Sequence, residues 1–211
     1  MTGLGIGAFV SLAGSVAGSD LSNQTPDPRQ PWIDRTAIAY RIRHEILANR
    51  PRRSVLLQIV PWLSPAALVL VAVLIAATAY WRGQLRWVFT FGAVVLTAPL
   101  VRGVLKPVID RRVPPATGAA ALTFPSGHLT ILGAVLMALF LLTQGTGVAF
   151  RTASAFTLAC IALGFATVFT LTGNHFATDC IGGLLIGASF VSAADFVGHR
   201  VAASRIGVRE R

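Results

Sequence analysis

Residues 55–80 read VLLQIVPWLSPAALVLVAVLIAATAY, a run of 26 residues without a charge. As an α-helix this run is about 39 Å long, which is enough to cross the hydrocarbon core of a bilayer with some tilt. The rest of the chain agrees with it: of 211 residues, 54% are hydrophobic and only 12% are charged, and the mean hydropathy is +0.68. A soluble domain usually carries about twice that charged fraction. The sequence therefore indicates an integral membrane protein.

Four further apolar segments follow, at residues 87–105, 129–143, 152–172 and 180–198. The segment 129–143 is short and spans a bilayer only if the preceding Ser-Gly-His joins its helix. The linkers are short, so successive helices should pack as antiparallel neighbours. Gly183 and Gly187 are small residues four apart, which favours close approach of the last helix to another. We predict an all-α integral membrane helical bundle with five transmembrane helices, or six if the N-terminal apolar segment inserts.

Two segments in the N-terminal part of the chain each allow two structural interpretations. Residues 3–18 are uncharged and rich in Gly, Ala and Ser, which fits an inserted helix or a mobile segment. Residues 19–54 hold seven arginines and suggest either a short amphipathic helix on the membrane or a solvated basic tail. We divide the chain into an N-terminal interfacial segment (1–54), a transmembrane domain (55–199) and a basic tail (200–211).

The charged residues are dispersed. The net charge is +10, and 17 of the 18 cations are arginine, but they lie in the N-terminal stretch and at the ends of apolar runs. This pattern argues against a nucleic-acid binder, and seven cations fall on each side of the membrane, so charge does not decide the orientation. The two cysteines are too few for a disulfide framework or a zinc site. Asp195 is expected at the interface far from Asp179, paired with Arg200 or with solvent.

Three polar clusters return to one membrane face when five helices are drawn. They are residues 106–114 (KPVIDRRVP), 125–128 (PSGH) and 173–179 (GNHFATD). In the second, Ser126 is a candidate N-cap, and the free N–H groups of the first turn, with Gly127 allowing close approach, form an anion site. His128 is placed to donate a proton to a leaving oxygen. The alternative for this tetrapeptide is an ordinary helix cap with an interfacial histidine.

His175 and Asp179 are four residues apart, so on a helix the carboxylate can hold one imidazole nitrogen and leave the other free as nucleophile or base. A purely structural His–Asp pair is the alternative. Lys106, Arg111 and Arg112 form a cationic patch beside these groups. This patch suits a phosphate, or it anchors lipid headgroups.

Together the three clusters resemble the type-2 phosphatidic acid phosphatase superfamily, which shares its core with vanadium haloperoxidases. Its signature is K-x6-R-P, then P-S-G-H, then S-R-x5-H-x3-D. The P-S-G-H motif matches in full, and H-x3-D matches at His175 and Asp179. The signature's first arginine falls on Val113, and its Ser-Arg pair falls on Val168 and Phe169, so that cation is absent. The Thr-Gly-Asn-His sequence at 172–175 looks like the branch that includes lipid inositol-phosphate transferases.

The resemblance implies a concrete mechanism. His175 would attack phosphorus to form a phosphohistidine, with Asp179 orienting it, and His128 would protonate the leaving lipid oxygen. The phosphoryl oxygens would be held by five residues: Lys106, Arg111, Arg112, Ser126 and Gly127. The family implies no cofactor and no metal. It also implies an active site on the extracytoplasmic face of the plasma membrane.

We therefore expect a membrane phosphatase that hydrolyses a lipid phosphate or a prenyl phosphate or diphosphate. The membrane and this substrate are the expected partners, without nucleic acid, and the oligomeric state is left open. One alternative is a phosphotransferase that passes the phosphoryl group to an alcohol, favoured by Gly-Asn-His and the absent arginine. Another is a non-catalytic membrane protein that binds lipid phosphates.

Overall fold

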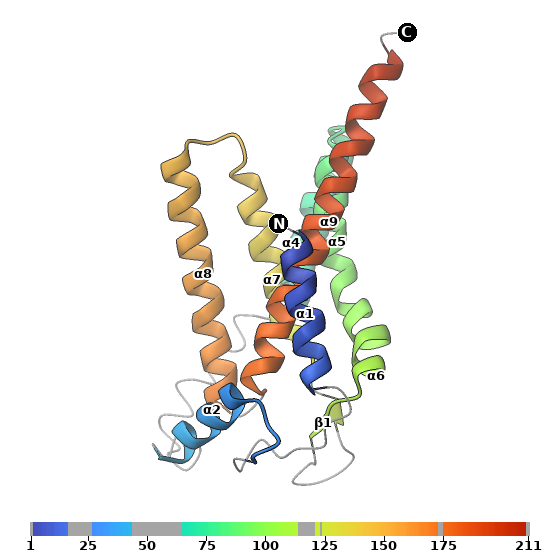
Figure 1. The fold of residues 1–211 in the computed structure, drawn as a ribbon. Helices are drawn as coiled ribbons and strands as arrows, with labels where there is room; N and C mark the ends of the chain where they lie inside the picture. Colours follow the sequence, from blue (N-terminus) through green and yellow to red (C-terminus); the bar gives the residue numbers. More distant parts are fainter. Residues whose placement is uncertain are drawn as a thin grey trace.

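The computed structural model is a bundle of helices with their long axes roughly along one direction (Figure 1). It describes residues 2–16, 27–43, 65–113, 121–122, 124–172 and 175–209. The helices are α1 (Thr2–Val16), α2 (Trp32–Arg43), α4 (Pro65–Trp81), α5 (Leu85–Leu100), the π-helical turn η2 (Val101–Leu105), α6 (Lys106–Ile109), α7 (Gly127–Leu142), α8 (Val148–Leu171) and α9 (Ala177–Arg209). Two short strands, β1 (Arg112–Val113) and β2 (Ala121–Leu122), pair antiparallel.

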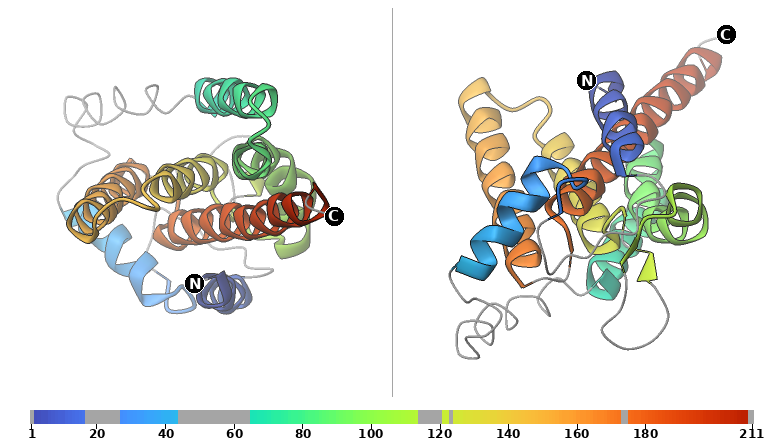
Figure 2. Two further views of the ribbon diagram at one scale, coloured as in Figure 1. Left: turned by 90° about the horizontal axis from the view of Figure 1, so that it is seen from above. Right: turned by 60° about the horizontal axis from the view of Figure 1, so that its bottom comes forward.

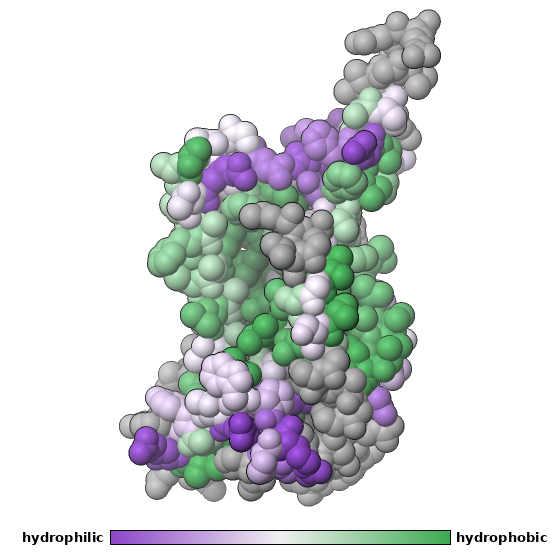
Figure 3. Space-filling model, in the orientation of Figure 1, coloured by the Kyte–Doolittle hydropathy of each residue, from purple (hydrophilic) through white to green (hydrophobic). Residues whose placement is uncertain are grey.

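The hydrophobic side chains form a belt across the middle of the bundle. On the visible face, hydrophilic residues gather at the two ends and hydrophobic residues lie between them (Figure 3). Within the described residues, three helical segments are long and apolar enough to cross a membrane: Leu85–Ile109, Val148–Leu171 and Ala177–Ser204. Two shorter apolar helices, Ala66–Trp81 and Gly127–Leu142, accompany them. The predicted all-α membrane bundle is confirmed, while its number of spans stays a prediction.

The N-terminal segments pack against the bundle. The chain forms a helix, α1, over most of residues 3–18, and Phe9 of α1 is buried against Phe124, with ring centroids 5.9 Å apart. Helix α2 crosses the lower ends of α8 and α9 (Figure 2). Its buried face includes Ile38, whereas Trp32 is exposed. Residues 44–64, with the start of the predicted run 55–80, lie outside the described part of the chain.

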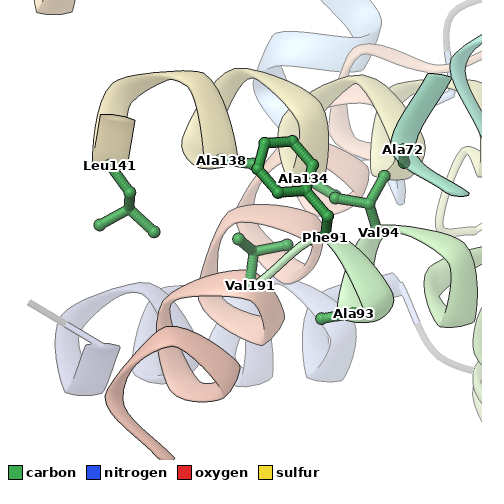
Figure 4. Packing of buried hydrophobic residues seen from close by; sticks show 8 residues of the cluster. All are labelled: Ala72, Phe91, Ala93, Val94, Ala134, Ala138, Leu141 and Val191. Atoms are coloured by element: carbon green, nitrogen blue, oxygen red, sulfur yellow. The ribbon is translucent and has the colours of Figure 1, made fainter. Parts of the chain in front are cut away.

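The centre of the bundle is built from small and medium-sized side chains. One buried cluster joins α4, α5, α7 and α9, and its members are Ala72, Phe91, Ala93, Val94, Ala134, Ala138, Leu141 and Val191 (Figure 4). Alanine has no side-chain rotamers to lose and keeps neighbouring helices close. This close packing gives the polar groups at the helix ends a fixed frame.

Helices α7 and α9 touch backbone to backbone through glycines. A Cβ atom on Gly183 would lie 2.7 Å from the Ser126 carbonyl oxygen, and one on Gly187 would overlap the carbonyl oxygen of Thr130. Gly133 faces the other way, and a Cβ there would lie 2.6 Å from a carbonyl oxygen of α9. The predicted close approach of the last helix is thus confirmed. It fixes the starts of α7 and α9, which carry two of the three polar clusters, relative to each other.

Asp195 binds a different residue from the one expected. Arg86 donates from Nε and Nη2 to the two carboxylate oxygens of Asp195, at 2.8 and 3.0 Å, and also to Gln144. Thr90 donates to the same carboxylate at 2.9 Å. Arg200 instead places its guanidinium 5.1 Å from the ring centroid of Phe196. The pairing of Asp195 with Arg200 or solvent is therefore wrong, because Arg86 and Thr90 of α5 occupy both carboxylate oxygens.

Candidate active site

The first cluster follows an irregular stretch of helix. Pro99 lies inside α5 and cannot donate a backbone hydrogen bond, and the chain then widens into the π-helical turn η2. Helix α6 begins directly at Lys106 and ends at Asp110, whose φ of 49° reverses the chain. This break places Lys106 at the wall of a cavity, while the chain turns away into β1.

The second cluster opens helix α7 as predicted. Ser126 is the N-cap, is fully buried, and accepts a long hydrogen bond of 3.5 Å from the backbone N–H of Leu129. Gly127 and His128 form the first helical positions, so both join the short apolar segment. The backbone N–H of Ser126 donates to the carbonyl oxygen of Asp179 at 3.0 Å. This bond ties the second cluster directly to the third.

The third cluster sits just before and inside the first turn of α9. His175 Nδ1 lies 3.6 Å from Asp179 Oδ2, a distance that pairs charges but is too long for a hydrogen bond. The same carboxylate oxygen accepts the backbone N–H of Phe176 at 3.2 Å, which fixes the carboxylate at the start of the helix. The predicted His175–Asp179 pair is present, and Asp179 is completely buried.

Phe169 occupies the space between the two histidines. Its ring centroid is 5.3 Å from that of His128 and 6.0 Å from that of His175, and its side chain is buried. Phe169 stands where the resemblance led us to expect an arginine. The position that would carry a cation therefore carries an aromatic ring that contacts both imidazoles.

One cavity of about 600 Å³ joins residues from all three clusters. Its lining comprises Lys106, Gly127, His128 and His175 with the apolar residues Ala66, Val69, Ala98, Pro99 and Ile131. A cation, a helix N-terminus and two imidazoles around one space suit an anionic group. The apolar wall from α4, α5 and α7 suits a hydrocarbon chain beside that group.

The remaining predicted residues with described side chains are not part of the cavity lining. Arg111 is 1% exposed and donates from Nη1 to Asp179 Oδ1 at 2.7 Å and to Thr178 Oγ1 at 2.6 Å. Its guanidinium also lies 3.7 Å from the ring centroid of Phe176. Arg112 begins strand β1, and its side chain is outside the described part of the structure, as are residues 114, 173 and 174. Of the eight predicted residues, four line the cavity, and Ser126, Asp179 and Arg111 are buried next to it.

Sequence reasoning missed Asp34 of helix α2. Its carboxylate is fully buried and accepts from the backbone N–H and the hydroxyl of Thr178, at 2.9 and 2.7 Å, and from Arg111 Nη2 at 3.0 Å. The available signal was weak, because Asp34 is one acid in an arginine-rich stretch. Among the described residues, no three His, Cys, Asp or Glu side chains gather as metal ligands.

Comparison with known proteins finds one matching family and one similar solved structure. The model of the PAP2 superfamily matches residues 87–194, more than half of the chain. No curated protein matches the sequence. The crystal structure of the transmembrane PAP2-type phosphatidylglycerolphosphate phosphatase of Bacillus subtilis is similar, with a TM-score of 0.67 and 18% sequence identity. That alignment covers 95% of this chain and 96% of the other, so the two share one fold over nearly their full lengths.

Proposed function

The chain belongs to the PAP2 superfamily, and on that premise we propose that it is a membrane phosphatase acting on a lipid phosphate or a prenyl phosphate or diphosphate. The observation that carries the proposal is the shared cavity: His128, His175 and Lys106, drawn from three distant segments, face one space beside an apolar wall. A phosphorylated lipid needs both kinds of surface, one for its head and one for its chain.

In the proposed reaction, His175 is the nucleophile. Because Nδ1 faces Asp179, Nε2 attacks phosphorus, an N–P bond forms, and the P–O bond to the lipid breaks. His128 donates its proton to the leaving oxygen, so an alcohol departs from a monophosphate substrate and a prenyl monophosphate departs from a diphosphate. In the second step His128 takes a proton from water, the resulting hydroxide attacks phosphorus, and the N–P bond breaks to release phosphate.

The proposed phosphate contacts are Lys106 and the backbone N–H of Gly127. Lys106 supplies a full positive charge, and Gly127 stands at the N-terminus of α7, where free N–H groups and the helix dipole favour an anion. Ser126 supports them by capping this helix. Arg112 remains a proposed phosphate ligand on its sequence position alone. Arg111 has both terminal nitrogens engaged by buried groups, so we assign it to Asp179 instead.

We place the proposed site on the extracytoplasmic face of the plasma membrane, as the family resemblance implies. The reaction needs no metal, since Lys106, the α7 N-terminus and His128 supply the charge stabilisation and the proton. A metal chelator should therefore leave turnover unchanged.

The test is phosphate release by the detergent-solubilised protein in excess chelator. Phosphatidic acid, phosphatidylglycerol phosphate and a prenyl diphosphate are offered to the wild type, to His175→Ala and to His199→Ala. His199 is exposed at the other end of α9 and serves as the matched control. We expect release by the wild type and the control, with at least about a 10³-fold loss for His175→Ala. A radiolabelled, acid-labile phosphoprotein should form with the wild type only.

Phosphate release from none of the three substrates by folded protein would overturn the phosphatase. Phe169 favours one second candidate, a phosphotransferase, because an apolar ring lies beside both histidines at the position where the family signature has a cation. Adding an alcohol acceptor such as glycerol or inositol separates the two, since a transferase yields the phosphorylated alcohol in place of free phosphate. Binding of substrate without either product would leave the non-catalytic alternative.

A further inference from the structure

Asp34 reaches the candidate active site from outside the part of the chain that matches the family. It lies on helix α2, more than fifty residues before the matched range begins at residue 87. Among the described residues, its side-chain hydrogen bonds run to the first turn of α9 and to the end of the first cluster: Thr178 through backbone and side chain, and Arg111 through its guanidinium. Helix α2 is thus joined to the site by a carboxylate at its N-terminal turn.

The hydrogen bonds form a directed chain toward the proposed nucleophile. The Thr178 hydroxyl donates to Asp34 and accepts from Arg111, so its single proton is used and its direction is fixed. Arg111 then holds Asp34 with Nη2 and Asp179 with Nη1. The other oxygen of Asp179 faces His175. Asp34 therefore touches neither the cavity nor His175, and two residues, Arg111 and Asp179, connect it to the imidazole.

The charges of the three side chains bear on the role of Asp34. One guanidinium lies between two carboxylates, and all three side chains are at most 1% exposed, so water does not weaken their attraction. With Asp34 in place, Arg111 divides its hydrogen bonds between two anions. Without that anion, Arg111 interacts with Asp179 alone and draws its carboxylate further from an imidazole that already lies 3.6 Å away.

We propose that Asp34 is a positioning residue for the reaction: by sharing Arg111 with Asp179, it sets the distance and orientation of the Asp179 carboxylate toward His175. The proposal rests on the proposed function, in which His175 attacks phosphorus. It makes helix α2 a part of the enzyme's working site and assigns Arg111 to the carboxylate pair.

The main test measures the rate constant for phosphorylation of His175 in a single turnover, with Asp34→Asn and the matched control Asp27→Asn. Asp27 is an acid in the loop before α2, bonded to the exposed Arg29. We expect Asp34→Asn to lower this rate constant about 10- to 100-fold, the scale for sub-ångström to ångström misplacement of a catalytic group, with KM changed less than about 3-fold. A lower amplitude with an unchanged rate constant means that Asp34 only supports folding, and it overturns the proposal.

A double variant covers the case in which Asp34→Asn does not fold. The variant Asp34→Asn with Arg111→Gln removes one charge of each sign and leaves no unpaired guanidinium. We expect it to fold and to phosphorylate as slowly as Arg111→Gln alone, because Asp34 acts through Arg111. A double variant that reacts at the wild-type rate, or clearly more slowly than Arg111→Gln, would contradict the proposal.

Hydrogen exchange separates this proposal from the proposed function. The Thr178 amide donates to Asp34, so Asp34→Asn should speed its exchange even in a protein that turns over no lipid. An unchanged exchange rate overturns the positioning role. Absence of phosphate release by the wild type is a separate result, which bears on the phosphatase itself.

Discussion

Helix α9 carries two ionic clusters that differ in their completeness, one at its first turn and one at Asp195, at the far end of the bundle. At the far end, Arg86 and Asp195 pair through two hydrogen bonds. Thr90 donates a further hydrogen bond to Asp195, and Arg86 donates one to Gln144. At the site end, one arginine serves two buried carboxylates, yet the Nε of Arg111 and the Nδ1 of His175 are buried without a hydrogen-bond partner among the described residues.

The difference agrees with a structural role for the far cluster and with the proposed catalytic role for the cluster at the candidate site. Buried polar atoms are normally paired, and an unpaired one requires an explanation such as strain or catalysis. The Arg86–Asp195 pair balances its charges and keeps some contact with solvent, its side chains being 21% and 10% exposed. The Asp34–Arg111–Asp179 cluster has an excess negative charge beside His175 and no contact with solvent. In the proposed reaction, an excess of negative charge there would stabilise the positively charged ring of the phosphohistidine.

The largest effect is expected from Arg111→Met. The substitution leaves the carboxylates of Asp34 and Asp179 buried without a cation, which costs about 3–5 kcal/mol of folding free energy. Turnover should fall as well, because Asp179 loses the contact that fixes it. Thermal unfolding in detergent, followed with phosphate release, measures both. Equal stability of Arg111→Met and the wild type would show that the cluster is solvated and would remove the contrast with the far end.

A smaller and purely structural effect is expected from Asp195→Asn. The far pair is partly exposed, so we expect a loss of about 1–3 kcal/mol in unfolding free energy and no change in turnover per folded molecule. Replacing both partners, as Arg86→Met with Asp195→Leu, should recover most of the stability. A drop in the rate constant for His175 phosphorylation in either variant would mean that the far cluster also serves the reaction.

The smallest effect is expected from Asp27→Asn. Arg29 is 75% exposed, and its hydrogen bonds lower the pKa of Asp27 from 3.8 to about 2. Such a depressed pKa stabilises the fold above pH 4, and this contribution is lost as the pH falls from about 4 to about 2. Solvent screens the pair, so the melting temperature of Asp27→Asn at neutral pH should equal that of the wild type. A clear shift in this variant would mean that the loop before α2 contributes to the docking of α2.

The sequence could predict the clusters but not all of their partners. Apolar runs predict helices because burial and membrane solvation depend on local composition, and the motif at 125–128 predicts a helix start because capping is local. Gly183 and Gly187 predicted close packing because the spacing of small residues is also a local feature of the sequence. Asp34 and Arg86 were missed as partners because their contacts join residues 77 and 109 positions apart. Such pairs depend on which helices become neighbours, and one arginine looks like another in a sequence with seventeen of them.

Helix α9 has a consequence for experiments on membrane sidedness. Its 33 residues make a rod of about 50 Å, longer than the hydrocarbon core of about 30 Å, and it begins beside the candidate site (Figure 1). The rod leaves the bundle at the opposite end, where Ala203 and Ser204 are exposed. A membrane-impermeant label on a cysteine introduced at either residue therefore reports the compartment that the site does not face. Labelling from the cytoplasm alone would put His175 outside the cell, and labelling from outside alone would put it in the cytoplasm.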